Sequence, residues 1–119
     1  MMLNTASGTP CTRLVFGAWA IGGTFTGKVS DQASLAALAY AFEQGINFFD
    51  TAAVYGNGHS EQLLGTFIRD KRSQVFIASK GGMGWKTDAE GFRMMQADAS
   101  AANLRQELDD SLKRLQTDY

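Results

Sequence analysis

The sequence has few of the residues that build metal sites and covalent crosslinks. Its 119 residues contain one cysteine, Cys11, one histidine, His59, and one proline. A single cysteine excludes a disulfide within the chain, and one cysteine with one histidine provides too few soft ligands for a closed zinc site. We therefore expect no metal site, and a reducing, cytoplasmic setting fits this composition best.

An excess of one charge and long apolar runs are missing as well. Eleven basic and twelve acidic residues leave a net charge of −1, so no strong field attracts nucleic acid or an anionic membrane surface. Residues 1–10 lack the basic start and apolar run of a leader, and no stretch reaches the ~20 apolar residues of a membrane span. The composition, 45% hydrophobic and 19% charged, is typical of one soluble globular domain with one core.

The chain does contain a regular alternation of strand and helix patterns. Three short segments rich in β-branched and aromatic residues predict strands: residues 13–21, 46–51 and 75–79. The second has the apolar centre expected of a strand buried on both faces. Helix patterns follow the first two segments. Ser30 and Ser60 are their predicted N-terminal caps, and Gly45 is the predicted left-handed stop of the first helix.

The last third of the chain predicts a long loop and a third helix. Residues 81–99 have no steady period and mix glycine with Trp85, Met94 and Met95, which indicates a functional loop whose large side chains line a substrate pocket or cover the loop itself. Ser100 opens the helix. Four leucines predict its buried face: Leu104, Leu108, Leu112 and Leu115. Two ion pairs four residues apart are expected on it: Asp109 with Lys113, and Asp110 with Arg114.

Strand and helix alternation predicts a parallel sheet with right-handed crossovers. Two architectures satisfy this pattern. One is a closed (β/α) barrel, which typically needs about 250 residues. The other is an open doubly wound sheet. In both, active sites lie at the carboxyl ends of the strands.

Three chemically distinct side chains meet at that end of the predicted sheet. Asp50 ends the second strand, Lys80 follows the third, and Tyr55 lies in the loop leaving the second, while neighbouring strands lie about 4.8 Å apart. The trio suits proton donation to a carbonyl oxygen. A free phenol, with a pKa of about 10, is a weak acid that a nearby ammonium strengthens, so Tyr55 would donate and Lys80 would assist. Asp50 would keep Lys80 charged and oriented.

Several motifs match one known family. They are Gly17-Ala18-Trp19 with Gly22-Gly23, the run from Gly45 to Ala52, Tyr55-Gly56, Ser60-Glu61 with Leu64-Gly65, Lys80, and the run from Ser111 to Leu115. Over nearly the whole chain they resemble the aldo-keto reductase family. The segment from Gly45 to Gly65 is the most specific part, because it covers a strand end, a turn and a helix start together.

The resemblance implies an α/β fold that is the N-terminal portion, about three β/α units, of a (β/α)8 TIM barrel. Residues 1–119 would then form a single partial barrel domain that ends before the fourth strand. It also implies an oxidoreductase that reduces an aldehyde or ketone, with NADPH (NADP) used more often than NADH (NAD). No particular carbonyl substrate is indicated.

The resemblance also implies roles for individual residues. Asp50, Tyr55 and Lys80 match three of the family's four catalytic positions, and Ala18 and Trp19, together with Asp50, match positions beside the nicotinamide. The fourth catalytic residue, a histidine from the fourth strand, has no counterpart in these residues, and the later loops that grip the cofactor's phosphates have none either. We therefore expect the 119-residue chain to be inactive by itself.

Other functions stay open at this point. An open doubly wound sheet would bind a dinucleotide with Asp50 on the ribose. Against it, Gly17, Gly22 and Gly23 miss the Gly-x-Gly-x-x-Gly spacing and do not open directly into a helix. A reductase-like barrel also serves as a non-catalytic, nicotinamide-sensing subunit in some assemblies, because a fold alone does not determine activity. An interrupted reading frame would likewise lack activity.

Overall fold

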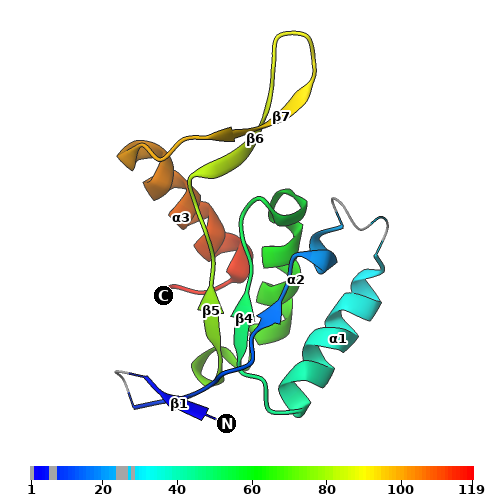
Figure 1. Cartoon of the computed structure of the whole chain (residues 1–119), viewed down its shortest axis with the longest axis vertical. Helices are drawn as coiled ribbons and strands as arrows, with labels where there is room; N and C mark the ends of the chain where they lie inside the picture. The colour runs from blue at the N-terminus through cyan, green and yellow to red at the C-terminus, as the bar shows by residue number, and fades with distance from the viewer. Residues whose placement is uncertain (1, 6–7, 24–26, 28) are drawn as a thin grey trace.

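A three-stranded parallel sheet lies at the centre of the computed structural model, which describes residues 2–5, 8–23, 27 and 29–119. Its strands are β3 (Phe16–Gly17), β4 (Phe48–Asp50) and β5 (Phe76–Ala78) (Figure 1). They lie side by side in their order along the chain, as expected for a segment of a barrel. This order does not match an open sheet with a switch in strand order.

The register of the sheet brings the carboxyl ends of its strands level. Gly17 pairs with Asp50, and Asp50 pairs with Ala78. Each strand is shorter than predicted, because the chain turns soon after this rim. After β3, for example, residues Ala20–Gly22 form a 3₁₀ turn, η1. The residues that follow the strands therefore leave the sheet at one common edge.

Three helices accompany the sheet: α1 (Asp31–Glu43), α2 (His59–Ile68) and α3 (Ala101–Leu115). Two predicted caps are confirmed. The hydroxyl of Ser30 accepts from the backbone N–H of Ala33 at 3.4 Å, and that of Ser100 accepts from Asn103 at 3.3 Å. Gly45, with a φ of 88°, follows α1 in the left-handed conformation as predicted. None of the helices in the described ranges is long and apolar enough to cross a membrane.

The prediction that Ser60 caps α2 is wrong. The helix begins at His59, two residues earlier than a Ser60 cap would place it, and its cap residue is Gly58, which has a left-handed φ of 91°. Ser60 lies inside the first turn and is fully buried. Its hydroxyl bonds to Ala18 and Thr51 at the ends of two strands instead of to its own helix. Local spacing does not reveal such partners, because they come from distant segments.

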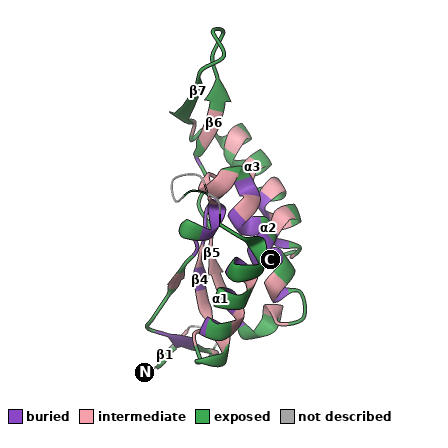
Figure 2. Cartoon of the chain, turned by 90° about the vertical axis from the view of Figure 1, so that its right-hand side faces the viewer, coloured by how far each residue is buried: buried purple, intermediate pink, exposed green. Residues whose placement is uncertain are grey.

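The apolar core lies between the helices and one face of the sheet. Phe49 of β4 has no exposed surface and packs edge-on against Phe67 of α2, with ring centroids 5.7 Å apart. The other face carries Phe48 and Phe76, whose ring centroids lie 6.4 Å apart and whose side chains are only half-buried. The prediction that β4 is buried on both faces is therefore wrong. Figure 2 shows the buried residues gathered where the helices meet the sheet.

The predicted leucine face of α3 is covered only in part. Leu115 is buried and Leu112 is half-buried. Leu104 and Leu108, however, are 40% and 58% exposed. The contact with α2 lies at the carboxyl-terminal end of α3, where Gly65 meets Leu115, and this explains why only that end is buried.

The predicted ion pairs on α3 are also wrong. The ammonium of Lys113 lies 3.4 Å from Asp110, three residues away, and not beside Asp109. Arg114 bonds to the buried carboxylate of Glu61 in α2. A tertiary partner therefore replaces the local one at Arg114.

Two antiparallel hairpins add to the sheet and helices, and the sequence predicts neither. The first joins β1 (Met2–Asn4) to β2 (Pro10–Thr12). The second joins β6 (Met83–Thr87) to β7 (Arg93–Ala97) and replaces the loop expected over residues 81–99. Its turn depends on Asp88, whose carboxylate accepts from the backbone N–H groups of Glu90 and Phe92. This hairpin projects away from the sheet (Figure 1).

Candidate active site

Two neighbouring strands and one turn bring the predicted site residues to the same rim. Asp50 is the last residue of β4, Lys80 follows β5 by two residues, and Tyr55 opens the turn η2 (Tyr55–Gly58). The two strand ends are tied together, because the backbone N–H of Thr51 donates to the carbonyl of Ala78 at 2.8 Å. The three side chains therefore start from one connected edge.

The ammonium of Lys80 contacts both of the other predicted groups. Its Nζ donates to Oδ1 of Asp50 at 2.6 Å and to the hydroxyl of Tyr55 at 3.3 Å. It also donates to the backbone carbonyl of Thr51 at 2.9 Å. The same nitrogen lies 5.0 Å from the centroid of the Tyr55 ring. The expected meeting of acid, amine and phenol is thus present in the structure.

The surroundings of Lys80 keep its side chain charged. Partial burial lowers the pKa of Lys80, but the hydrogen bonds to Asp50 and Tyr55 and the negative charge of Asp50 together outweigh burial. The net result is a pKa raised above the ordinary value of 10.5. A cation therefore stands beside the hydroxyl of Tyr55 at neutral pH, at a rim where the Lys80 side chain is 50% exposed.

A close approach of two glycines holds the turn that carries Tyr55. A Cβ atom on Gly22 would lie 2.8 Å from both the carbonyl carbon of Tyr55 and the nitrogen of Gly56. A Cβ atom on Gly56 would collide with the carbonyl oxygen of Gly22. The turns η1 and η2 therefore touch backbone to backbone. This contact explains Gly22 and Gly56, which in the sequence only mark the resemblance.

The two residues expected beside a nicotinamide differ in exposure. Ala18 is completely buried, and its backbone groups bond to Asp50 and Ser60. Trp19, the next residue, is 51% exposed. Of this pair, only Trp19 offers side-chain surface at the rim.

The single histidine does not join the rim. Nε2 of His59 lies 2.8 Å from a carboxylate oxygen of Asp31 at the start of α1. Cys11 is buried in β2. Among the residues that the structure describes, no group of three or more His, Cys, Asp or Glu side chains is placed to hold a metal ion.

A cavity of about 520 Å³ lies between the glycine turns and the second hairpin. Trp85 of β6 anchors the hairpin there, because its Nε1–H donates to the carbonyl of Val54 at 3.1 Å. Arg93 of β7 lines the same cavity, with its guanidinium 5.6 Å from the ring of Trp85. Met94 and Met95 do not line it and are exposed. Arg93 could not be singled out from the sequence, since the hairpin itself was not predicted.

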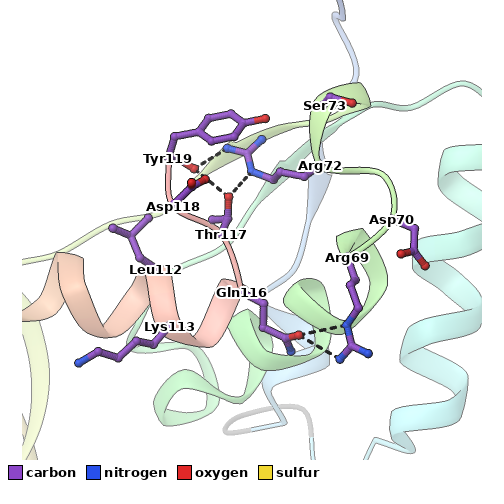
Figure 3. Close-up of a pocket in the computed structure, with 10 residues that line it drawn as sticks. All are labelled: Arg69, Asp70, Arg72, Ser73, Leu112, Lys113, Gln116, Thr117, Asp118 and Tyr119. Atoms are coloured by element: carbon purple, nitrogen blue, oxygen red, sulfur yellow. Dashed lines mark hydrogen bonds between the residues drawn. The ribbon is translucent and has the colours of Figure 1, made fainter.

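Another cavity, of about 730 Å³, lies away from this rim (Figure 3). It is lined by the segment before β5 and by the end of α3. Its arginines already have partners. Arg69 donates twice to Oε1 of Gln116. Arg72 donates to the hydroxyl of Thr117 and to the carbonyl of Tyr119. None of the three rim residues lines this cavity, so its size does not make it the reactive site.

Parallel strand and helix units define the class of protein as part of a (β/α) barrel, and the polar cluster lies at the end where the active sites of such barrels are found. The family model described as the aldo/keto reductase family matches residues 13–119. The chain belongs to the aldo/keto reductase family.

Individual relatives agree with this assignment. The chain is 41% identical over 115 residues to the aldo-keto reductase YhdN of Bacillus subtilis (strain 168). The match covers 95% of this chain and 33% of YhdN. It is similar to the structure of the glycerol dehydrogenase AKR11B4 from Gluconobacter oxydans, with a TM-score of 0.79, 34% identity, and coverage of 98% of this chain and 35% of that one.

A third relative has been solved with a cofactor. The chain is similar to an aldo-keto reductase from Klebsiella pneumoniae in complex with NADPH, with a TM-score of 0.74 and 26% identity. The match covers 99% of this chain and 36% of that one. These structural neighbours are (β/α)8 barrels, so this chain has the fold of the first part of such a barrel. It spans about a third of the length of the curated relative YhdN.

Proposed function

We propose that this chain supplies the proton-donating part of an active site that reduces an aldehyde or ketone with a nicotinamide cofactor. The observation that carries the proposal is the contact of Lys80 with both Asp50 and Tyr55. This contact puts a fixed cation beside a phenol at the rim where barrel enzymes react. Membership of the aldo/keto reductase family supports the same reading.

Tyr55 is the proton donor in this proposal. As its proton moves to the carbonyl oxygen of the substrate, negative charge develops on the phenolic oxygen, and the ammonium of Lys80 stabilises that charge. The carboxylate of Asp50 holds the ammonium at 2.6 Å and favours its charged form. The proton transfer leaves the substrate oxygen as an alcohol once the carbonyl carbon has been reduced.

The cofactor in this proposal is NADPH, with NADH as the alternative, and when bound it supplies a hydride to the carbonyl carbon. The residues at the rim fit a nicotinamide, because Trp19, two residues after the Gly17 that pairs with Asp50, presents an exposed aromatic side chain. The similar Klebsiella pneumoniae structure in complex with NADPH supports the phosphorylated form. No observation favours the sensing-subunit alternative. The carboxylate of Asp50 is bonded to Lys80, which does not favour a role on a ribose.

The substitution Tyr55→Phe tests the proposal. Because the chain spans a third of YhdN, activity is measured on a chimaera in which residues 1–119 are followed by the remaining sequence of YhdN. Tyr55→Phe should lower kcat for NADPH-dependent aldehyde reduction by about 10²- to 10⁴-fold, since only the proton donor is lost. The affinity for NADPH, measured by fluorescence titration, should stay nearly unchanged.

Tyr40 provides the matched control, because it lies on α1 and is 65% exposed. Tyr40→Phe in the same chimaera should keep full turnover. Normal turnover in Tyr55→Phe would show that another group supplies the proton. Loss of turnover in both variants would point to a general effect on folding.

The 119-residue polypeptide alone is expected to show no measurable NADPH-dependent reduction. Its single histidine, His59, is paired with Asp31 and contributes nothing to the rim. An assay with NADPH and a panel of aldehydes measures this directly. Turnover by the polypeptide itself would contradict the expectation.

A further inference from the structure

The first turn of α2 carries two polar side chains that are completely buried. Ser60 and Glu61 each have 0% relative exposure. They follow Gly58, which provides no side-chain cap for the helix. Both side chains reach out of the helix to the sheet, and together they contact the ends of all three parallel strands.

Ser60 connects the ends of β3 and β4. Its hydroxyl donates to the carbonyl oxygen of Ala18 at 2.8 Å and lies 2.9 Å from the hydroxyl of Thr51. Ala18 follows β3 directly, and Thr51 follows Asp50 directly. One buried hydroxyl therefore ties the residues after two neighbouring strands to the same helix turn.

Glu61 connects α2 to the end of β5. One carboxylate oxygen accepts from the hydroxyl of Ser79 at 2.5 Å, and the other accepts from Nε of Arg114 at 2.6 Å. Arg114 is held in turn by the hydroxyl of Ser111 at 3.2 Å and packs against Gly58. The carboxylate is thus bonded on both sides, and one of its partners is the residue before Lys80.

Stability alone is a weak reason for a buried ion pair. Removing a carboxylate and a guanidinium from water costs about as much as their attraction returns, and well-packed apolar side chains often serve equally well. A pair bonded in this way does, however, define the position of each partner. For Ser79 that position is next to the ammonium-bearing residue of the candidate site.

We propose that Ser60 and Glu61 are positioning residues that hold the carboxyl ends of β3, β4 and β5 in register, so that Lys80 stays between Asp50 and Tyr55. Arg114 compensates the buried charge of Glu61 and links this arrangement to α3. The proposal assigns these residues to the site of the proposed function, but the geometry it describes does not depend on catalysis.

The titration of Lys80 reports this geometry. Its raised pKa depends on short contacts with Asp50 and Tyr55, against the opposing effect of burial. On the α3 side, Glu107 faces the same segment and accepts from the backbone N–H of Gly82. If the end of β5 moves, the contacts of Lys80 lengthen and its pKa falls toward the ordinary lysine value.

The experiment measures trace acetylation of each lysine against pH in the 119-residue chain at low micromolar concentration, read by peptide mass spectrometry. The midpoint for a lysine is the pH at which its acetylation rate is half-maximal. Asp50→Asn is the positive control and should lower the midpoint of Lys80. Ser79→Ala and Glu61→Gln should move it in the same direction by a smaller amount. Lys71 precedes the amino-terminal end of β5, away from the rim, and its acetylation should not differ between the variants. Ser73→Ala, an exposed serine in the same region as Lys71, is the matched control and should leave Lys80 unchanged.

Ser79→Ala decides the outcome if Glu61→Gln disturbs folding, because it removes only one hydroxyl. Circular dichroism of each variant establishes that the fold is intact. If Ser79→Ala and Glu61→Gln are both folded and their Lys80 midpoints equal that of the chain without substitutions, the proposal is overturned. The contact between Ser79 and Glu61 would then be purely structural. Failure of carbonyl reduction in the chimaera would overturn the proposed function without moving any of these midpoints, so the two failures are distinguishable.

Discussion

Asn47, the residue before β4, shows how one polar side chain joins two parts of the chain. Its Oδ1 accepts from the backbone N–H of Thr12 at 2.9 Å, and its Nδ2 donates to the carbonyl of Pro10 at 2.9 Å. The hydroxyl of Thr12 adds a contact at 3.1 Å. This side chain therefore attaches the first hairpin to the amino-terminal end of the sheet.

Asn47→Ala should lower the free energy of unfolding by about 1–3 kcal/mol, because it leaves the partly buried N–H of Thr12 without its partner and removes the exposed bond to the carbonyl of Pro10. Urea denaturation followed by circular dichroism measures the change. Gln32→Ala, on the exposed surface of α1, is the control and should change stability by less than about 0.5 kcal/mol. Equal stability of the two variants would show that the side-chain contacts of Asn47 contribute nothing measurable to the folded state.

At the scale of elements, α2 contacts the parallel sheet and both of the other helices. It packs on the sheet through Phe67, on the strand ends through Ser60 and Glu61, and on α3 through Gly65. A Cβ atom on Gly65 would collide with the carbonyl oxygen of Arg114 and lie 2.9 Å from Cα of Leu115. The backbones of the two helices therefore meet at this glycine. A backbone cannot move aside to make room for a Cβ atom as a flexible side chain can.

Gly65→Ala should therefore destabilise the chain even though alanine favours a helix. The propensity gain is about 1 kcal/mol. Overpacking at a rigid contact costs about 1–3 kcal/mol or more, so a net loss of up to about 2 kcal/mol is expected in urea denaturation. Gly84→Ala is the matched control, because its Cβ would meet only Glu107, at an ordinary 3.8 Å. A Gly65→Ala variant as stable as Gly84→Ala would contradict the close helix contact.

At the scale of the whole molecule, the parallel sheet is open on both sides within the described ranges. β3 and β5 each pair only with β4, and the sheet face that carries Phe48 and Phe76 is half-exposed. A complete barrel pairs every strand with two neighbours and fills its interior with side chains. Unpaired strand edges are templates for pairing with other chains.

The 119-residue polypeptide should therefore associate as its concentration rises. Sedimentation velocity over a range from low micromolar to high micromolar is expected to show growth beyond the monomer, and the chimaera with YhdN should show none over the same range. A polypeptide that stays monomeric and melts cooperatively throughout this range would contradict the prediction.

The sequence predicts those features whose signals are local. Ser30 and Ser100 cap helices through hydrogen bonds that span three residues, so their spacing is enough to find them. The rim position of Asp50 and Lys80 follows from strand ends, because parallel strands finish at one edge. Helical spacing also predicts that Leu104 and Leu108 belong to a buried face, but they are exposed, because this spacing shows only which residues share a face and not what covers it.

The sequence by itself determined the order of the three parallel strands and the helices between them, the family, and the placement of an acid, a phenol and an amine at one rim, because periodicity, capping and strand ends are short-range properties. Only the tertiary structure decided that Ser60 bonds to the sheet, that Glu61 pairs with Arg114, and that residues 83–97 form a hairpin. The partners of Ser60 and Glu61 lie up to 53 positions away, and chain folding selects them by shape, burial and charge together, which no local pattern encodes.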